Sequence, residues 1–246
     1  MKRLLLWFLL TGPAALGQTL DSARVATIPT KSDFKFSLLT EVGYVLAVTS
    51  TPNMAAFYRQ NQIKRDSPLD PFVHVNVGGR YQRLKLLMQT GYGVNFLAPS
   101  ERSVLAVRRT YASYSGMMLG YDVLNGRNQR LYLNAGVGGL FYDYSVVNRT
   151  NQAVVFQQLP QYSQSGNIPS LKLTNTYWDL NLEFAQREKR KTSFFPVMRL
   201  GYRRGVQARQ WESGALQLLD APSDRISQVY FSGSFYISRN YASAAK

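Results

Sequence analysis

Few residues of this chain could do chemistry, and their types narrow what that chemistry can be. The sequence contains one histidine, His74, and no cysteine. A catalytic thiol, a thiolate metal site, a disulfide scaffold and a multi-histidine metal site are therefore excluded. No recognisable catalytic motif accompanies His74. We predict no catalytic residue, no metal ligand and no cofactor.

Charged side chains recur at alternate positions of several segments, opposite apolar ones. Six of them form a candidate ion-pair network: Glu41, Lys85, Asp179, Glu183, Arg199 and Arg203. If a hairpin turn centres near Lys189 and Arg190, Asp179 faces Gly201, with Arg199 and Arg203 diagonal to it. Glu183 is then diagonal to Arg199, and Glu41 joins them across a narrow lumen. We predict a structural network, with a gated narrow pore as the alternative.

Alternation of apolar and polar residues with a period of two predicts strands with two different faces. Eight segments show this period: 34–46, 73–80, 85–96, 107–121, 131–141, 177–184, 198–203 and 229–237. Apolar residues such as Val42 and Phe36 occupy one face of the first segment, and Ser37 and Glu41 occupy the other. The sequence therefore predicts an all-β protein of eight strands.

The connections between these strands alternate between short and long. Short turns are expected near Gln82, at Asn125-Gly126 and at 187–191, and Asn-Gly is a strong hairpin signal. The four longer connections span 50–70, 98–106, 148–170 and 211–226. This asymmetry is typical of closed, antiparallel, up-and-down membrane barrels, which have tight turns on one side and longer loops on the other.

A membrane barrel turns its apolar face outward to lipid, whereas a soluble calyx turns it inward around a ligand. The polar face is rich in glycine and serine, as a narrow lumen requires. It also mixes charges of both signs, with Lys35 and Arg80 beside the six network residues. The apolar face carries the aromatic residues expected of an interfacial girdle: Tyr44, Tyr92, Phe96, Trp178, Phe184, Phe194, Tyr202, Phe231 and Phe235. We predict a transmembrane β-barrel.

The N-terminus has the features of a cleaved export signal. Lys2 and Arg3 precede an apolar run, 4–10, that is too short to span a bilayer as a helix, and Ala15-Leu16-Gly17 forms a small-x-small cleavage pattern. We predict a signal peptide at 1–17, a periplasmic segment at 18–31, the barrel at 32–241 and a tail at 242–246.

This pattern resembles the small outer-membrane β-barrel superfamily of OmpA-like and OmpX-like eight-stranded barrels, and most of all its Bacteroidetes-type members. The last strand matches the family's outward pattern at Val229, Phe231, Phe235, Ile237 and Tyr241. The chain departs from it at Arg239 and in the tail that follows the final aromatic residue. The resemblance implies insertion by the barrel-assembly machinery and residence in the cell outer membrane.

The formal charge is +15, but the basic residues are scattered, which favours an anionic lipid surface over nucleic acid. Basic residues of the long loops are expected to contact lipopolysaccharide: Arg59, Lys64, Arg65, Arg102, Arg108, Arg149 and Arg209. We predict a monomeric, non-enzymatic protein that interacts at the surface through these loops. A passive pore is the first alternative. The second is a lipid A-modifying enzyme that uses His74 near the rim with a serine and an acidic residue.

Overall fold

The computed structural model describes residues 34–65, 68–94, 105–148, 170–188, 190–214 and 217–242. The chain divides into two units, Met1–Ser32 and Asp33–Lys246, and every described element belongs to the second. The predicted signal peptide (1–17), the segment 18–31 and residues 243–246 of the tail lie outside the described residues, as do Phe96, Arg102 and Arg149. No helix in the described part of the chain is long and apolar enough to cross a membrane.

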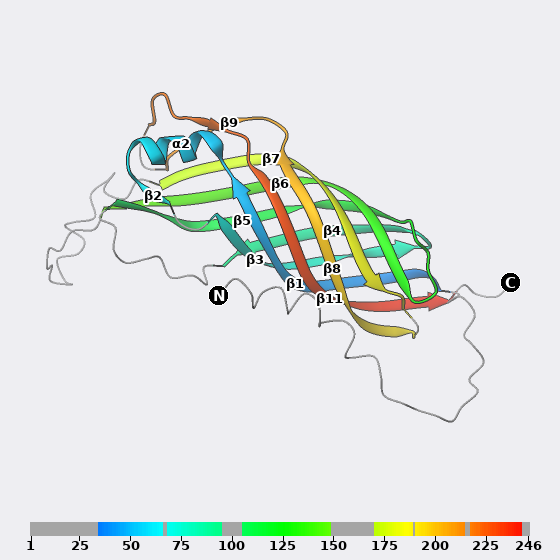
Figure 1. Cartoon of the computed structure of the whole chain (residues 1–246). Coiled ribbons are helices and arrows are strands. Elements are labelled where there is room, and N and C mark those ends of the chain that lie inside the picture. Colours follow the sequence, from blue (N-terminus) through cyan, green and yellow to red (C-terminus); the bar gives the residue numbers. More distant parts are fainter. Residues whose placement is uncertain are drawn as a thin grey trace, which may run out of the picture. The chain divides into compact units, whose positions relative to one another are not determined.

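Eight long strands form a closed barrel (Figure 1). They are β1 (Phe34–Ser50), β3 (Leu69–Tyr81), β4 (Leu84–Gly93), β5 (Leu105–Asp122), β6 (Gln129–Asn148), β7 (Ser170–Gln186), β8 (Thr192–Gly205) and β11 (Ser227–Ala242). Each strand pairs antiparallel with the next long strand in sequence, and β11 closes the barrel on β1. The predicted closed, up-and-down, eight-stranded barrel is confirmed.

The outer face of the barrel is apolar on every strand. Exposed apolar side chains include Val42, Val77, Met88, Leu119, Leu133, Leu182, Leu200 and Phe235. The neighbouring charged side chains point inward, so that Val42 is 48% exposed and Glu41 is fully buried. A water-soluble protein rarely exposes a continuous apolar patch of this extent. All eight strands also reach the ~9–11 residues needed to cross the hydrocarbon. The barrel is therefore a transmembrane one.

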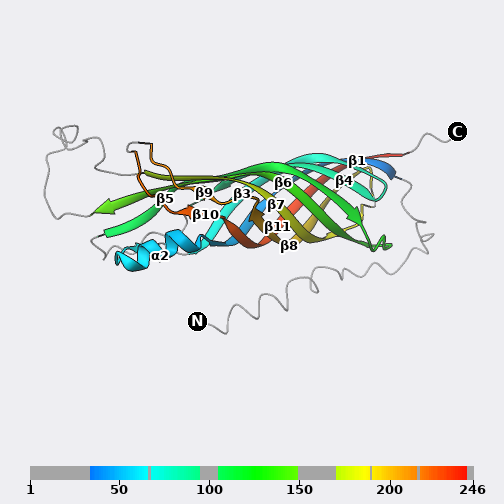
Figure 2. The same ribbon diagram turned by 90° about the horizontal axis from the view of Figure 1, so that it is seen from above.

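The two ends of the barrel differ, and we name them by their connections. The short-turn end carries the tight turns at Gln82 and Asn125, both with positive φ (54° and 44°), and the turn after Gln186. The long-loop end carries the four longer connections. Its described parts contain α2 (Pro52–Gln60), β2 (Lys64–Arg65), β9 (Arg209–Gln210) and β10 (Ser223–Asp224). Figures 1 and 2 show α2 and β9 together at this end, opposite the end of β11.

One predicted lumen residue is wrong. Lys35 is exposed, although the alternation of β1 placed it on the inner face. The pairing of β1 with β11 shifts register between Phe34 and Phe36, at the very end of the strand. A bulge at this point breaks the strict period of two, so Lys35 points to the outside of the short-turn end.

Candidate functional site

The lumen of the barrel is filled by side chains in layers of different chemistry. An ionic cluster lies at the short-turn end, and an apolar layer that includes Leu39, Leu87 and Met118 follows it. A central charged network comes next on three strands, where Glu41, Glu183 and Arg199 lie two positions beyond Leu39, Ala185 and Val197. Lys85 reaches the network from the short-turn side of Leu87. Beyond it, a second and larger apolar cluster reaches the long-loop end. Ionic and apolar layers therefore alternate along the lumen.

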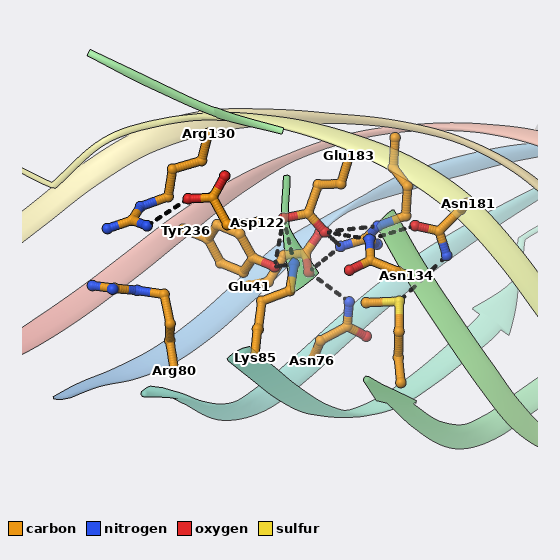
Figure 3. A network of polar contacts seen from close by, with 12 residues as sticks. Glu41, Asn76, Arg80, Lys85, Asp122, Arg130, Asn134, Asn181, Glu183 and Tyr236 are labelled. Atoms are coloured by element: carbon orange, nitrogen blue, oxygen red, sulfur yellow. Dashed lines mark hydrogen bonds and ion pairs between the residues drawn. The ribbon is translucent and has the colours of Figure 1, made fainter. Parts of the chain in front are cut away.

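The central network contains Glu183 of β7, Glu41 of β1 and Lys85 of β4 (Figure 3). Arg199 of β8 completes it. Lys85 Nζ donates to Glu183 Oε1 at 2.5 Å, and Arg199 Nη2 donates to Glu183 Oε2 at 2.8 Å. Arg199 Nη2 also donates to Glu41 Oε2 at 3.0 Å. All four side chains are buried. The network thus joins four strands across the lumen.

Polar neighbours complete the hydrogen bonding of Glu41. Asn76 Nδ2 donates to its Oε2 at 2.7 Å, and Ser234 Oγ donates to its Oε1 at 2.5 Å. His74 Nε2 lies 3.2 Å from the same Oε1. A buried carboxylate is tolerated only when it is paired and hydrogen-bonded. Both carboxylate oxygens of Glu41 therefore have partners within the lumen.

Asp179 and Arg203 form a second ion pair on the long-loop side of the central network, and Asn181 and Asn134 connect Asp179 to Glu183 by hydrogen bonds. Arg203 Nε donates to Asp179 Oδ2 at 3.1 Å, and the Tyr230 hydroxyl donates to both carboxylate oxygens at 2.8 and 3.0 Å. The Arg203 guanidinium lies 4.1 Å from the Tyr114 ring centroid. Gly201 makes room for this arrangement, since a Cβ there would approach Tyr230 Cζ to 2.4 Å. The structure therefore brings all six predicted residues into ion pairs, in two groups.

The predicted register between β7 and β8 is wrong by two residues. Asp179 lies opposite Arg203 and Glu183 lies opposite Arg199, whereas the prediction placed Asp179 opposite Gly201. Gly201 pairs instead with Asn181. The turn between these strands is displaced toward the C-terminus, because Glu188 folds back into the lumen. The ion pairs are consequently direct cross-strand pairs and not diagonal ones.

The ionic cluster at the short-turn end contains Arg80, Asp122, Arg130 and Glu188. Arg130 Nη1 donates to Asp122 Oδ2 at 2.8 Å, and its Nε donates to Glu188 Oε2 at 3.1 Å. Arg80 Nε lies 3.4 Å from Glu188 Oε1. Sequence reasoning placed Arg80 on the inner face but missed the other three. Their signal was the position of Asp122 and Arg130 on either side of the Asn125-Gly126 hairpin.

The surroundings of His74 do not form a nucleophile–base pair. His74 is buried, and its ring contacts Glu41. The nearby hydroxyl of Ser234 donates to the same carboxylate and not to the imidazole. Nucleophilic catalysis needs the base within hydrogen-bond reach of the nucleophile. No group of three or more potential metal ligands occurs among the described residues.

Asp224 holds together the folded part of the long-loop end, which sequence reasoning expected only as loops. Its carboxylate accepts the backbone N–H groups of Asn53 and Met54 at 2.8 Å each, and Trp211 Nε1 at 2.9 Å. These N–H groups belong to the first turn of α2, where an anion is favourable. We call α2, β9, β10 and Trp211 the loop platform. Its sequence signal was Thr51-Pro52, a helix start with proline at the first position.

The chain was compared with known proteins by sequence and by structure. No protein-family model and no curated protein matches the sequence. Among solved structures, the chain is similar to Neisserial surface protein A, with 12% identity, a TM-score of 0.44, and 82% of this chain and 96% of that one covered. It is also similar to the attachment invasion locus protein of Yersinia pestis, with 9% identity, a TM-score of 0.41, and 83% of this chain and 99% of that one covered. A third similar structure is the outer membrane protease OmpT of Escherichia coli, with 7% identity, a TM-score of 0.35, and 85% of this chain and 98% of that one covered.

These similarities concern the fold alone. The predicted likeness to small outer-membrane β-barrels is confirmed at that level by the strand number and the topology of the chain. Its Bacteroidetes type stays a prediction.

Proposed function

We propose that this chain is a monomeric protein of the cell outer membrane that interacts at the surface through its loop platform. The observation that carries the proposal is the clamp at Asp224, which fixes α2 to Trp211 and to β10. A barrel needs none of these elements to close. A folded platform presents its side chains in fixed positions, which reduces the entropy lost on binding.

The filled lumen supports a binding role over a passive pore. Charged side chains from four strands meet at the centre, and their carboxylates are saturated with hydrogen bonds. Opening a path would separate buried ion pairs, which is strongly destabilising. Purified protein in a planar bilayer is expected to give no conductance steps, and regular steps would favour the pore.

We propose anionic glycolipid, lipopolysaccharide in particular, as the partner of the platform. Exposed basic side chains on the described part of the long-loop end are Arg59, Arg204, Arg209 and Arg225. Exposed acidic residues also occur there, at Glu212 and Asp220, so basic groups are in excess. Each basic group near an anionic surface contributes about 1 kcal/mol.

The outer pattern of β11 supports insertion by the barrel-assembly machinery. Val229, Phe231, Phe235 and Ile237 are all exposed on the outer face. With the short turns in the periplasm, the platform would face the outside of the cell.

Binding of lipopolysaccharide to the barrel in neutral phosphatidylcholine nanodiscs tests this proposal. The double variant Arg59→Gln/Arg209→Gln should bind roughly thirtyfold more weakly, because two platform charges are lost. The matched control Lys35→Gln/Arg83→Gln removes two exposed charges from the short-turn end and should bind as the wild type does. Equal binding by both variants would contradict the role of the platform.

A further inference from the structure

At the short-turn end, β8 separates from β7 and leaves a gap in the barrel wall. The pairing of β7 with β8 stops at Ala185 and Val197. The pairing of β8 with β11 continues to Thr192 and Arg239. Pro196, directly before the last paired residue, has no N–H to donate to a neighbouring strand. The start of β8 therefore has a partner on one side only.

This gap opens into a hollow of about 680 Å³ with a mixed lining. Its walls include Gln186 at the end of β7, Arg187 after it, Arg190 before β8, and Phe194 on β8. Phe194 is 67% exposed, so a large aromatic surface stands at the mouth. A hollow that combines guanidinium groups with an aromatic ring suits an amphiphile better than a water-soluble anion.

An apolar groove continues from the hollow along the outer face of the barrel. It is lined by Leu182, Phe184, Met198, Leu200 and Phe231. Phe184 lines the groove and Gln186 lines the hollow, and they are consecutive exposed residues of β7, so the two lie next to each other along this strand. The groove therefore runs toward the bilayer centre, as an acyl chain does.

The exposed charges around the hollow are basic. Arg190, Lys191 and Arg239 are exposed, and Arg239 is paired with Thr192 at the mouth. The acidic residues described at this end, Asp122 and Glu188, are buried against Arg130 and Arg80. These buried carboxylates therefore do little to neutralise the positive charge that a ligand in the hollow would meet.

Burial, and after it the positive charge of Arg130, lower the pKa of Arg187 below its usual range. A guanidinium still stays protonated in a protein. An approaching anion would relieve this crowding of positive charge.

We propose that the hollow and the groove together bind one anionic phospholipid. Its phosphate lies among Arg187, Arg190 and Lys191, and one acyl chain follows the groove beside Phe184 and Met198. The basic groups around the hollow match an anionic headgroup, and the groove runs in the direction of an acyl chain, so both features favour this occupant. The site does not depend on the proposed surface role, which concerns the opposite end of the barrel.

Native mass spectrometry of the full barrel tests the site, after reconstitution in a mixture of phosphatidylglycerol and phosphatidylcholine. The wild type should retain phosphatidylglycerol in preference to phosphatidylcholine. Arg190→Gln/Lys191→Gln should reduce that retention by roughly thirtyfold, because two basic groups that would contact the headgroup are lost. Thr192→Trp should reduce it too, since Thr192 lines the hollow and an indole would occupy it.

The matched control is Lys35→Gln/Arg83→Gln, which removes the same charge from the same end of the barrel. Arg83 lies at the turn of β3 and β4, and the backbone of Lys35 is hydrogen-bonded to Gln82 of that turn, so neither residue lines the hollow. This variant should retain phosphatidylglycerol as the wild type does. Equal loss in both double variants would reveal a diffuse basic surface and overturn the site. Equal retention of both lipids by the wild type would overturn it as well.

Discussion

The centre of the lumen and its long-loop end are filled by opposite chemistry. At the centre, Glu41, Lys85, Glu183 and Arg199 meet from four strands. At the long-loop end, aromatic and aliphatic side chains form one apolar cluster that includes Phe72, Tyr142, Tyr144 and Trp211. Both fillings exclude space. At the long-loop end the buried ion pair of Asp70 with Arg109 also joins β3 to β5, so ion pairing predominates at the centre and apolar packing at the long-loop end.

This difference teaches where the barrel is cooperative and where it can open. The central ion pairs join residues far apart in the chain, such as Lys85 and Glu183, so their loss affects the whole barrel. The platform rests on contacts among α2, Trp211 and Asp224, and Trp211 packs against Tyr144 at the end of the barrel. Regions of this kind can unfold locally while the remainder stays folded.

The largest effect is expected for Glu183→Ala, which leaves Lys85 without its carboxylate partner and Arg199 with Glu41 alone. Removal of one partner of a buried pair destabilises by about 3–5 kcal/mol. Urea unfolding in detergent, with heat-modifiable gel migration as a second readout, measures the loss. Glu212→Ala, at an exposed acidic residue, is the control and should change stability by less than about 0.5 kcal/mol. If Glu183→Ala lowered the free energy of unfolding by as little as the control, the central network would not stabilise the barrel.

The double variant Lys85→Met/Glu183→Leu sharpens the same point. It removes both charges of one pair, while Arg199 keeps Glu41 at 3.0 Å. Replacing a buried pair by apolar residues is often neutral, because no unpaired charge remains. The double variant should therefore lose less stability than Glu183→Ala in the same urea titration. A larger loss would mean that the charges themselves, and not their pairing, hold the strands.

A smaller and local effect is expected for Asp224→Ala. The platform loses an acceptor for two N–H groups and the Trp211 indole, so the loss falls on the platform and not on the pairing of the barrel strands. Limited proteolysis should cut within 52–60 in the variant while the urea midpoint of the barrel stays unchanged. Asp220→Ala, at an exposed acidic residue of the same connection, should resist the protease. Unchanged proteolysis of Asp224→Ala would remove the distinction between platform and barrel.

The smallest effect is expected for His74→Phe. Glu41 would lose one contact but keep Asn76, Ser234 and Arg199, so the loss should be about 1 kcal/mol. Mass analysis of lipid A from cells with wild-type and variant protein should give the same species. A lipid A species that depends on His74 would establish the enzyme alternative.

The sequence by itself determined the class of this protein. A strand places alternate side chains on opposite faces, so a period of two fixes inside and outside from local information alone. Val42 and Glu41, or Leu182 and Glu183, therefore lie on the predicted sides. The Asn125-Gly126 turn and the lengths of the connections likewise gave the strand order, because both are properties of short segments.

Only the tertiary structure decided which inward residues meet. A shift of two residues between β7 and β8 leaves every side chain on its face, so the alternation could not distinguish Arg203 from Gly201 as the partner of Asp179. The contact of Glu41 with Arg199 depends on closure of the barrel, and the contact of Asp224 with α2 joins two separate loops. Such partners are set by the paths of several strands at once, and no local pattern of residues encodes them.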